Sequence, residues 1–140
     1  MSDLRVETVT LPQLGGSPFF GFAVRAHAEL LESGFADPCA PLLYHSTRAV
    51  VATVQDEPIG VIAYNHAPHD RSLNVALGFV LADYRRRRVY RGLWEEVVKE
   101  ARRLDCGRIY GVVSSKNSGM LRVAAALGRR VESVNVVYEV

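Results

Sequence analysis

The segment Val80–Glu100, VLADYRRRRVYRGLWEEVVKE, decides both the fold and the place of a candidate site. It starts at the end of an apolar run, passes through four consecutive arginines and continues with apolar residues at helical spacing. This pattern predicts a buried strand, a short basic loop and a helix. Because the first N–H groups of a helix are unpaired and its dipole is positive there, the junction predicts an anion site. The alternative is that the guanidinium groups extend into water.

The residues after the arginines predict a helix of about four turns with one buried stripe. The stripe comprises Val89, Leu93, Val97, Ala101 and Leu104, with Trp94 as a core residue. Glu95 is expected to pair with Lys99 one turn later.

The C-terminal part of the chain predicts a further strand, a helix and a last strand. Arg108–Ser114 reads as a second buried strand, and Val131–Val140 reads as terminal strand, in one long or two short pieces. Asn117 is expected to cap a helix that stops at Gly128. The inward residues of this helix are Met120, Val123, Ala124 and Leu127. Arg129 and Arg130 are expected in a solvated turn.

The N-terminal part predicts a strand, a helix, a hairpin and a central strand. The ranges are Leu4–Leu11 for the first strand, Phe19–Glu32 for the helix, Arg48–Gln55 and Ile59–Asn65 for the hairpin around Asp56–Pro58, and Leu73–Leu81 for the central strand. Gly78 in that central strand indicates a bulge or a close approach of the backbone to a ligand. We therefore predict one α/β (α+β) domain over residues 1–140, with a mixed, mostly antiparallel sheet of roughly six to seven strands and helices on both faces.

Bulk composition is typical of a soluble globular protein, since 49% of the residues are hydrophobic and 23% are charged. No apolar run approaches the ~18 residues of a membrane span, and the first residues lack a signal-peptide pattern. We expect a cytoplasmic protein that does not bind membranes. Cys39 and Cys106 lack metal-type spacing and are expected to pack as small apolar groups, so no metal site is predicted.

The net charge of +2 hides an asymmetry between the two parts of the chain. Residues 1–84 hold 4 arginines against 9 acids, whereas residues 85–140 hold 13 basic residues against 6 acids. The positive part is a plausible site for an acidic ligand, and arginine offers forked binding to phosphate.

The order of the elements and the residues at their junctions resemble the GNAT superfamily of acyl-CoA N-acyltransferases. The segment Phe79–Arg85 is similar to the end of the family's fourth strand, Glu100–Val113 to its third helix and fifth strand, and Asn117–Gly128 to its fourth helix. The resemblance implies transfer of an acetyl or other acyl group from acyl-CoA to an amine. The acceptor, a small molecule or a protein, stays open.

In this family the loop after the fourth strand reads Arg/Gln-x-x-Gly-x-Gly/Ala and holds the CoA pyrophosphate. The present sequence has Arg85 in the first position but Arg88 and Tyr90 where the glycines stand. Bulky residues there crowd a phosphate, although arginine side chains can bind phosphate themselves. The resemblance implies cofactor contacts at Phe79, Val80, Leu81, Arg85, Arg86, Arg87, Arg88, Val89, Tyr90, Arg91 and Asn117.

Catalytic groups are harder to assign, because the helix tyrosine that the family uses as an acid is Ala124 here. The central strand carries no acid or histidine. The candidates among nearby residue types are Ser115, Tyr110 and His66, followed by His69, Asp70 and Tyr138. Phe20, Phe35, Tyr44 and His45 either line an acceptor pocket or belong to the core.

Three functional hypotheses follow. The first is an acyl-CoA-dependent N-acetyltransferase. The second is a GNAT fold that has lost catalysis and serves as a binding or assembly module. The third is association with nucleic acid through Arg85–Arg88. The apolar terminal strand also suggests a homodimer.

Overall fold

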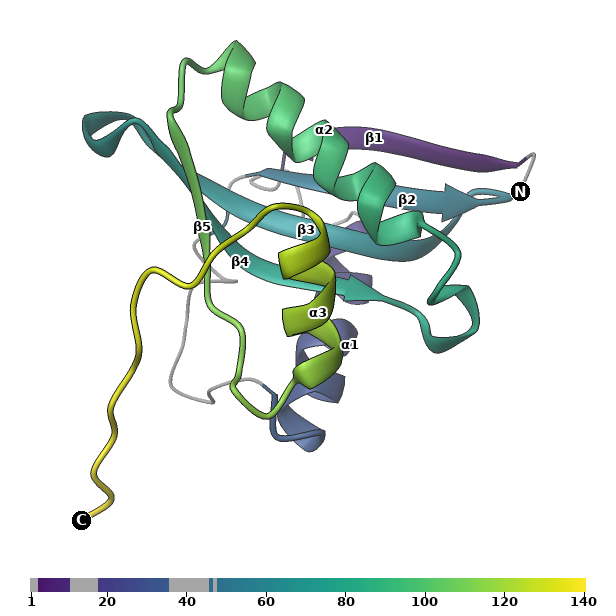
Figure 1. Cartoon of the computed structure of the whole chain (residues 1–140). Coiled ribbons are helices and arrows are strands. Elements are labelled where there is room, and N and C mark those ends of the chain that lie inside the picture. The colour runs from purple at the N-terminus through teal and green to yellow at the C-terminus, as the bar shows by residue number, and fades with distance from the viewer. Residues whose placement is uncertain (1–2, 11–17, 36–45, 47) are drawn as a thin grey trace.

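The structure is a computed structural model that describes residues 3–10, 18–35, 46 and 48–140 (Figure 1). Its elements in chain order are β1 (Leu4–Thr10), α1 (Pro18–Glu32), β2 (Arg48–Val54), β3 (Glu57–Ala67), the 3-10 turn η3 (Pro68–Asp70), β4 (Ser72–Val80), the 3-10 turn η4 (Ala82–Tyr84), α2 (Val89–Arg103), β5 (Arg108–Gly111) and α3 (Ser118–Ala126).

The strands form one mixed sheet in the order β1-β2-β3-β4-β5. The first three pairings are antiparallel, and β4 pairs with β5 in parallel because α2 crosses over between them. The predicted mixed, mostly antiparallel sheet is therefore confirmed, with five strands in the described part instead of six to seven. The difference lies at the C-terminus, where residues 131–140 are not in a strand.

Helix α1 covers one face of the sheet. Phe22, Ala23 and Ala26 pack there against strand residues that include Val51 and Phe79. The Phe22 and Phe79 rings meet edge to face, with their centroids 6.0 Å apart. Successive residues of β2 point to opposite faces of the sheet. Val51 faces α1, while Val50 and Ala52 face the other side.

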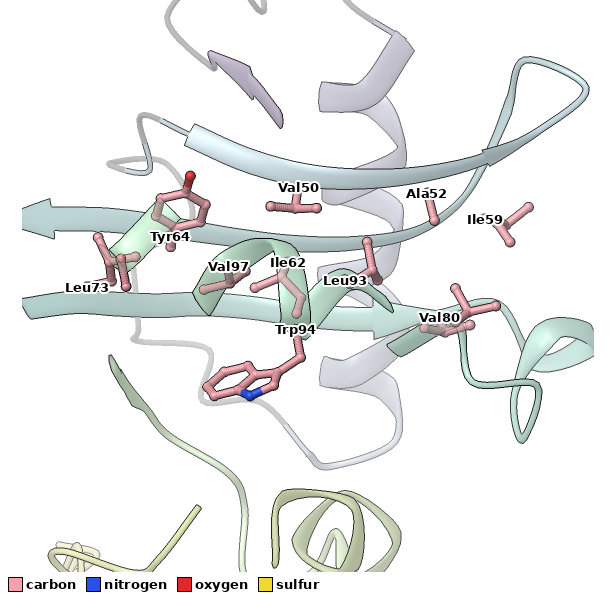
Figure 2. Close-up of a cluster of buried hydrophobic side chains, with 12 residues drawn as sticks. Val50, Ala52, Ile59, Ile62, Tyr64, Leu73, Val80, Leu93, Trp94 and Val97 are labelled. Carbon is pink, nitrogen blue, oxygen red and sulfur yellow. The ribbon is translucent and has the colours of Figure 1, made fainter. Parts of the chain in front are cut away.

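Helix α2 covers the opposite face, and the cluster between it and the sheet is the larger core (Figure 2). Leu93, Trp94 and Val97 of α2 lie over Ile62 and Val80 of the sheet. Trp94 is buried, as its place beside the apolar stripe predicted. Helices thus lie on both faces of the sheet, as expected.

The hairpin between β2 and β3 turns one residue earlier than predicted. Gln55 and Asp56 form the turn, with φ values of 50° and 64°, while Glu57 and Pro58 already belong to β3. A two-residue turn with positive φ at both positions matches the twist of the two strands, which explains why the pairing starts earlier.

The C-terminal elements are more exposed than predicted. β5 is an edge strand with no buried residue, and none of the predicted inward residues of α3 is buried. The reason is that no described element covers their outer side. A smaller correction concerns α2, where Lys99 pairs with Glu96 at 3.0 Å, one position away from the expected Glu95.

Candidate functional site

The strands β4 and β5 separate partway along their length. They pair only between Ser72–Val75 and Arg108–Gly111, so β4 continues for five residues, 76–80, without a β5 neighbour. The peptide groups of β4 that point toward β5 in this stretch have no strand partner in the described part of the chain. We call this opening the β4–β5 split. It offers N–H and C=O groups to an extended ligand.

The N-terminus of α2 lies directly after the end of β4 and the turn η4. Arg88 occupies the capping position with φ 63° and ψ 15°, makes no side-chain cap, and is followed by no acid in the first turn. The first backbone bond of this helix is donated by Gly92 N–H to Arg88 O, at 3.2 Å. The earlier N–H groups of the helix are therefore available to an anion.

Two of the four loop arginines are used to hold the loop in place. Arg85 Nε donates to Val80 O at 2.8 Å, and the guanidinium lies 5.4 Å from the Phe79 ring centroid. Arg85 also pairs with Glu29 of α1 at 3.8 Å. Arg87 lies over the Tyr84 ring at 5.8 Å. These contacts tie the basic loop to the end of β4.

The other two, Arg86 and Arg88, are exposed and have no side-chain partner among the described residues. Both have positive φ, 61° and 63°. The left-handed conformation at Arg88 falls where the family pattern has its first glycine, so the backbone keeps the turn although the residue has changed. These two guanidinium groups, together with exposed Arg91 on the first turn of α2, are the free cations at the helix N-terminus.

Tyr90 and Arg129 meet beside the β4–β5 split, on the face of the sheet that α2 covers. The Tyr90 ring and hydroxyl lie against Gly78 of β4, where a Cβ atom would be 3.2 Å from the hydroxyl oxygen. Arg129 Nη1 donates to Tyr90 Oη at 3.3 Å, and its guanidinium stacks on Trp94 at 4.4 Å. Arg129 also approaches Gly111 of β5, with Nη2 2.7 Å from the position of a Cβ there. Glycines on both strands make room for this pair, so that Gly78 is approached by the Tyr90 side chain of the protein itself.

The environment of Tyr90 keeps its hydroxyl protonated. Burial raises the pKa of Tyr90 above its ordinary value of 10.0, and Arg129 opposes this only in part. Since Arg129 donates to the hydroxyl oxygen, the Tyr90 proton remains free for another acceptor. A neutral phenol and a guanidinium, both of them hydrogen-bond donors, therefore lie beside the split.

Phe79, Val80 and Leu81, which were predicted to contact the cofactor, lie at the end of β4. Phe79 and Val80 are buried on opposite faces at the end of β4, and Leu81 N–H donates to Ile59 O at 2.8 Å. Asn117 caps α3 as predicted, because its Oδ1 accepts from Met120 N–H at 3.1 Å.

The catalytic candidates do not gather at the split. His66, at the end of β3, pairs with Leu73, and His69 and Asp70 lie in η3, all at the far end of β4 from the basic loop. Tyr110 Oη accepts from Arg108 Nη1 at 2.8 Å on the outer strand. Ser115 lies in an exposed turn, and Tyr138 is exposed on the C-terminal segment.

Arg129 is the site residue that the sequence did not reveal, since it was expected in a solvated turn. Its stacking partner Trp94 and its hydrogen-bond partner Tyr90 are far away in the chain, so no local pattern points to it. Of the proposed acceptor pocket, Phe20 packs on the α1 core, whereas Tyr44 and His45 lie outside the described residues. In the described part of the chain no cluster of metal-ligating residues occurs, and no helix is long and apolar enough to cross a membrane.

Comparison with known proteins places this geometry in context. A family model described as the acetyltransferase (GNAT) family matches residues 18–128. The comparison with curated protein sequences gives no match.

Among solved structures, an aminoglycoside acetyltransferase from an uncultured soil metagenomic sample superimposes with a TM-score of 0.74 at 12% identity, covering 99% of this chain and 97% of that one. A ribosomal-protein-alanine N-acetyltransferase from Brucella melitensis biovar Abortus 2308 gives 0.71 at 12% identity, with 98% and 99% coverage. The aminoglycoside N-acetyltransferase AAC(6')-Iy in complex with CoA gives 0.66 at 18% identity, with 97% and 93% coverage. At these identities the likeness concerns the fold.

Proposed function

The chain belongs to the acetyltransferase (GNAT) family, and from that premise we propose that it moves an acetyl group from acetyl-CoA to an amine of a cationic acceptor. The observation that carries the proposal is the β4–β5 split. It runs from an uncapped helix N-terminus with free arginines to a pair of hydrogen-bond donors, Tyr90 and Arg129. Such a site suits three parts of an acyl-CoA, which are its anionic head group, its extended arm and its reactive carbonyl.

The residues present fit this cofactor. The free N–H groups at the start of α2 suit a pyrophosphate, and Arg86 and Arg88 add charge-assisted hydrogen bonds to it. The unpaired edge of β4 suits the amide groups of an extended arm. When bound, acetyl-CoA would supply the acyl group as a thioester with a thiolate leaving group.

The chain's own residues then have separate roles in the proposal. The guanidinium of Arg129 donates hydrogen bonds in the split, where negative charge on a carbonyl oxygen has to be stabilised. The Tyr90 hydroxyl, which accepts a hydrogen bond from Arg129, would give its proton to the departing sulfur and would regain one from the amine, which loses a proton on acylation. In this assignment Tyr90 takes over the function for which the family uses the helix position that is Ala124 here.

The acceptor is proposed from charge. Residues 1–84 hold 9 acids against 4 arginines. This excess of negative charge attracts a polyamine more than a neutral amine. The soil metagenomic neighbour was also solved in complex with sisomicin, an aminoglycoside, whereas another neighbour is a ribosomal-protein-alanine N-acetyltransferase. We therefore rank a polycationic small molecule ahead of a protein N-terminus as the acceptor.

The test combines binding and turnover. Calorimetric titration with CoA is compared for the wild type, the double variant Arg86→Ala/Arg88→Ala, and the matched control Arg102→Ala at the other end of α2. Loss of two charge-assisted contacts should raise the Kd about 10- to 100-fold, while the control should bind as the wild type does. Thiol release from acetyl-CoA is then measured with sisomicin, spermidine and a peptide with an N-terminal alanine.

Each outcome has a defined meaning. Absence of CoA binding at millimolar concentration contradicts the proposal, as does equal weakening by the control. CoA binding without turnover on any of these amines supports the binding-module hypothesis instead. Turnover of the peptide alone would support acetyl transfer as the reaction, but it would rank a protein N-terminus ahead of a polycationic small molecule as the acceptor. For the role of Tyr90, Tyr90→Phe should lower kcat about 100-fold with little change in CoA affinity.

A further inference from the structure

A pocket of about 500 Å³ lies at the β1 edge of the sheet, which is the edge away from the β4–β5 split. The described residues that line it are Arg5, Val6, Glu7, Phe19, Thr53 and Asp56. They belong to β1, the start of α1, the end of β2 and the turn after β2. Two strands separate β1 from β4 in the sheet, so these two strands are roughly 14 Å apart. We call this the β1 pocket, and it is separate from the site proposed for acetyl-CoA.

The strand register places three polar side chains of the β1 pocket on one face of the sheet. Arg5 lies opposite Thr53, and Glu7 lies opposite Val51. Val51 packs against α1. Side chains two positions apart on a strand, or directly opposite on its neighbour, share a face, so the three polar side chains point to the face that α1 covers. Asp56 reaches the same pocket from the β2–β3 turn.

These four polar groups have no partner in the part of the chain that the structure describes. Thr53 is only 4% exposed, yet its hydroxyl makes no hydrogen bond with a described residue. Arg5, Glu7 and Asp56 likewise make no ion pair or side-chain hydrogen bond there. A buried hydroxyl without a partner lowers stability unless water or a ligand satisfies it. Polar groups that converge on a pocket and are not used by the fold are typical of a binding site.

The charges of the β1 pocket define the ligand that complements them. The carboxylates of Glu7 and Asp56 favour a ligand with two cationic groups. The guanidinium of Arg5 repels a purely cationic polyamine or a metal ion, whereas it binds a carboxylate through forked hydrogen bonds. The Phe19 ring offers an apolar surface to methylene groups between the charges. The complementary ligand therefore carries one carboxylate, two cationic groups and a short aliphatic chain.

We propose that the β1 pocket binds a free basic amino acid of the lysine or ornithine kind. The ligand carboxylate pairs with Arg5 and accepts a hydrogen bond from the hydroxyl of Thr53, which lies opposite Arg5 in the register. The two ammonium groups are bound by Glu7 and Asp56. The pocket volume of about 500 Å³ is within the range of small-molecule sites. Binding in this pocket does not require acetyl-CoA.

Ligands that each lack one charged group test this assignment. In calorimetric titration of the full-length protein without CoA, L-lysine should bind with a Kd below about 1 mM. Norleucine lacks the side-chain ammonium group, cadaverine lacks the carboxylate, and Nα-acetyl-lysine lacks the charged α-amine. Each should bind about tenfold more weakly than L-lysine or worse. No binding of L-lysine at about 10 mM, or cadaverine binding as tightly as L-lysine, would overturn the proposal.

Substitutions that keep size and remove one polar group locate the site. Asp56→Asn and Glu7→Gln should each raise the Kd for L-lysine about tenfold, and Thr53→Val should raise it about fivefold. Glu57→Gln removes an exposed carboxylate that is next to Asp56 but is not among the described lining residues, and this control should bind as the wild type does. Because the Thr53 hydroxyl makes no hydrogen bond with a described residue, Thr53→Val should melt no lower than the wild type.

A variant at the β4–β5 split distinguishes this pocket from the proposed catalytic site. Tyr90→Phe should leave the Kd for L-lysine unchanged, whatever its effect on acetyl transfer. If Tyr90→Phe raises that Kd while the three pocket variants leave it unchanged, the amino acid binds at the split and the β1 pocket is not its site. That result would overturn this proposal and would leave the proposed acetyl transfer intact.

Discussion

Replacing Arg88 distinguishes two ways in which the basic loop can hold a phosphate, through the arginine side chain or through the backbone N–H groups. Arg88 lies in the left-handed region at φ 63°, and its side chain has no partner among the described residues. A non-glycine residue in this conformation costs about 1–2 kcal/mol. Glycine removes that cost but adds about 0.5–1 kcal/mol of chain entropy lost on folding. Arg88→Gly should therefore be about 0.5–1 kcal/mol more stable than the wild type, whereas Arg88→Ala keeps the strain and should be close to the wild type.

Urea unfolding measures this difference directly. With a slope of about 1–3 kcal/mol per molar urea, Arg88→Gly should shift the midpoint upward by about 0.5 M relative to Arg88→Ala. Both variants lose the same guanidinium, so both should bind CoA about tenfold more weakly than the wild type, with a smaller dependence on salt.

Two results would refute this reasoning. If Arg88→Gly is less stable than Arg88→Ala, the left-handed turn is not a source of strain at this position. If Arg88→Gly binds CoA more tightly than the wild type, the phosphate is held by the backbone N–H groups, and the arginine side chain only crowds the site.

Three further predictions concern the core and the split. Tyr64 is fully buried and its hydroxyl makes no well-formed hydrogen bond in the described part of the chain, although the Arg48 guanidinium opposes part of the rise in its pKa. Tyr64→Phe should therefore stabilise the protein by up to about 1 kcal/mol in chemical unfolding at pH 7. Burial, with the nearby negative charge of Glu100, raises the pKa of Tyr64 from 10.0 to about 12. The stability of the wild type should therefore fall between about pH 10 and 12, and the stability advantage of Tyr64→Phe should widen there. An equal difference in stability between the two proteins at about pH 7 and pH 11 would contradict this. The hydrogen bond from Arg103 lowers the pKa of Glu100 below its ordinary value of 4.5, so the contribution of this ion pair to stability is present at neutral pH and is lost in acid. Because water screens the exposed Arg103, Glu100→Gln should cost only about 0.5 kcal/mol at pH 7, and this deficit should close below pH 4.5 in thermal melts. Gly78→Ala should weaken CoA binding and lower stability, because the new Cβ atom meets the Tyr90 ring. The same change in a Tyr90→Ala background should be nearly neutral. Additive effects in this double-mutant cycle would show that the two residues do not interact.

Local patterns were sufficient for most of the fold. The apolar run of β2 and the spacing of three and four in α2 place in the core the same residues that the structure buries, including Leu93 and Trp94. The N-cap at Asn117 was readable from a single polar residue before an apolar run. The error at the β2–β3 turn arose because Asp and Pro both mark turns, and only the strand register decides which residues occupy one.

The candidate site was predictable in part. The four arginines at the start of α2 indicated an anion site, but the sequence treats them alike. The structure divides them, since Arg85 and Arg87 hold the loop while Arg86 and Arg88 remain free. The division depends on which side chains face the end of β4, and this depends on the φ of each residue in the loop.

The sequence by itself determined the order of elements, the two faces of the sheet and the basic junction, because each follows from residues within a few positions of one another. Only the tertiary structure decided that Tyr90 and Arg129, 39 positions apart, meet over glycines of two strands. It also decided that residues 131–140, although patterned as a strand, are not one within a single chain. A strand requires hydrogen-bonding partners on a neighbouring edge, and whether that edge is within reach is a property of the folded chain and not of the segment.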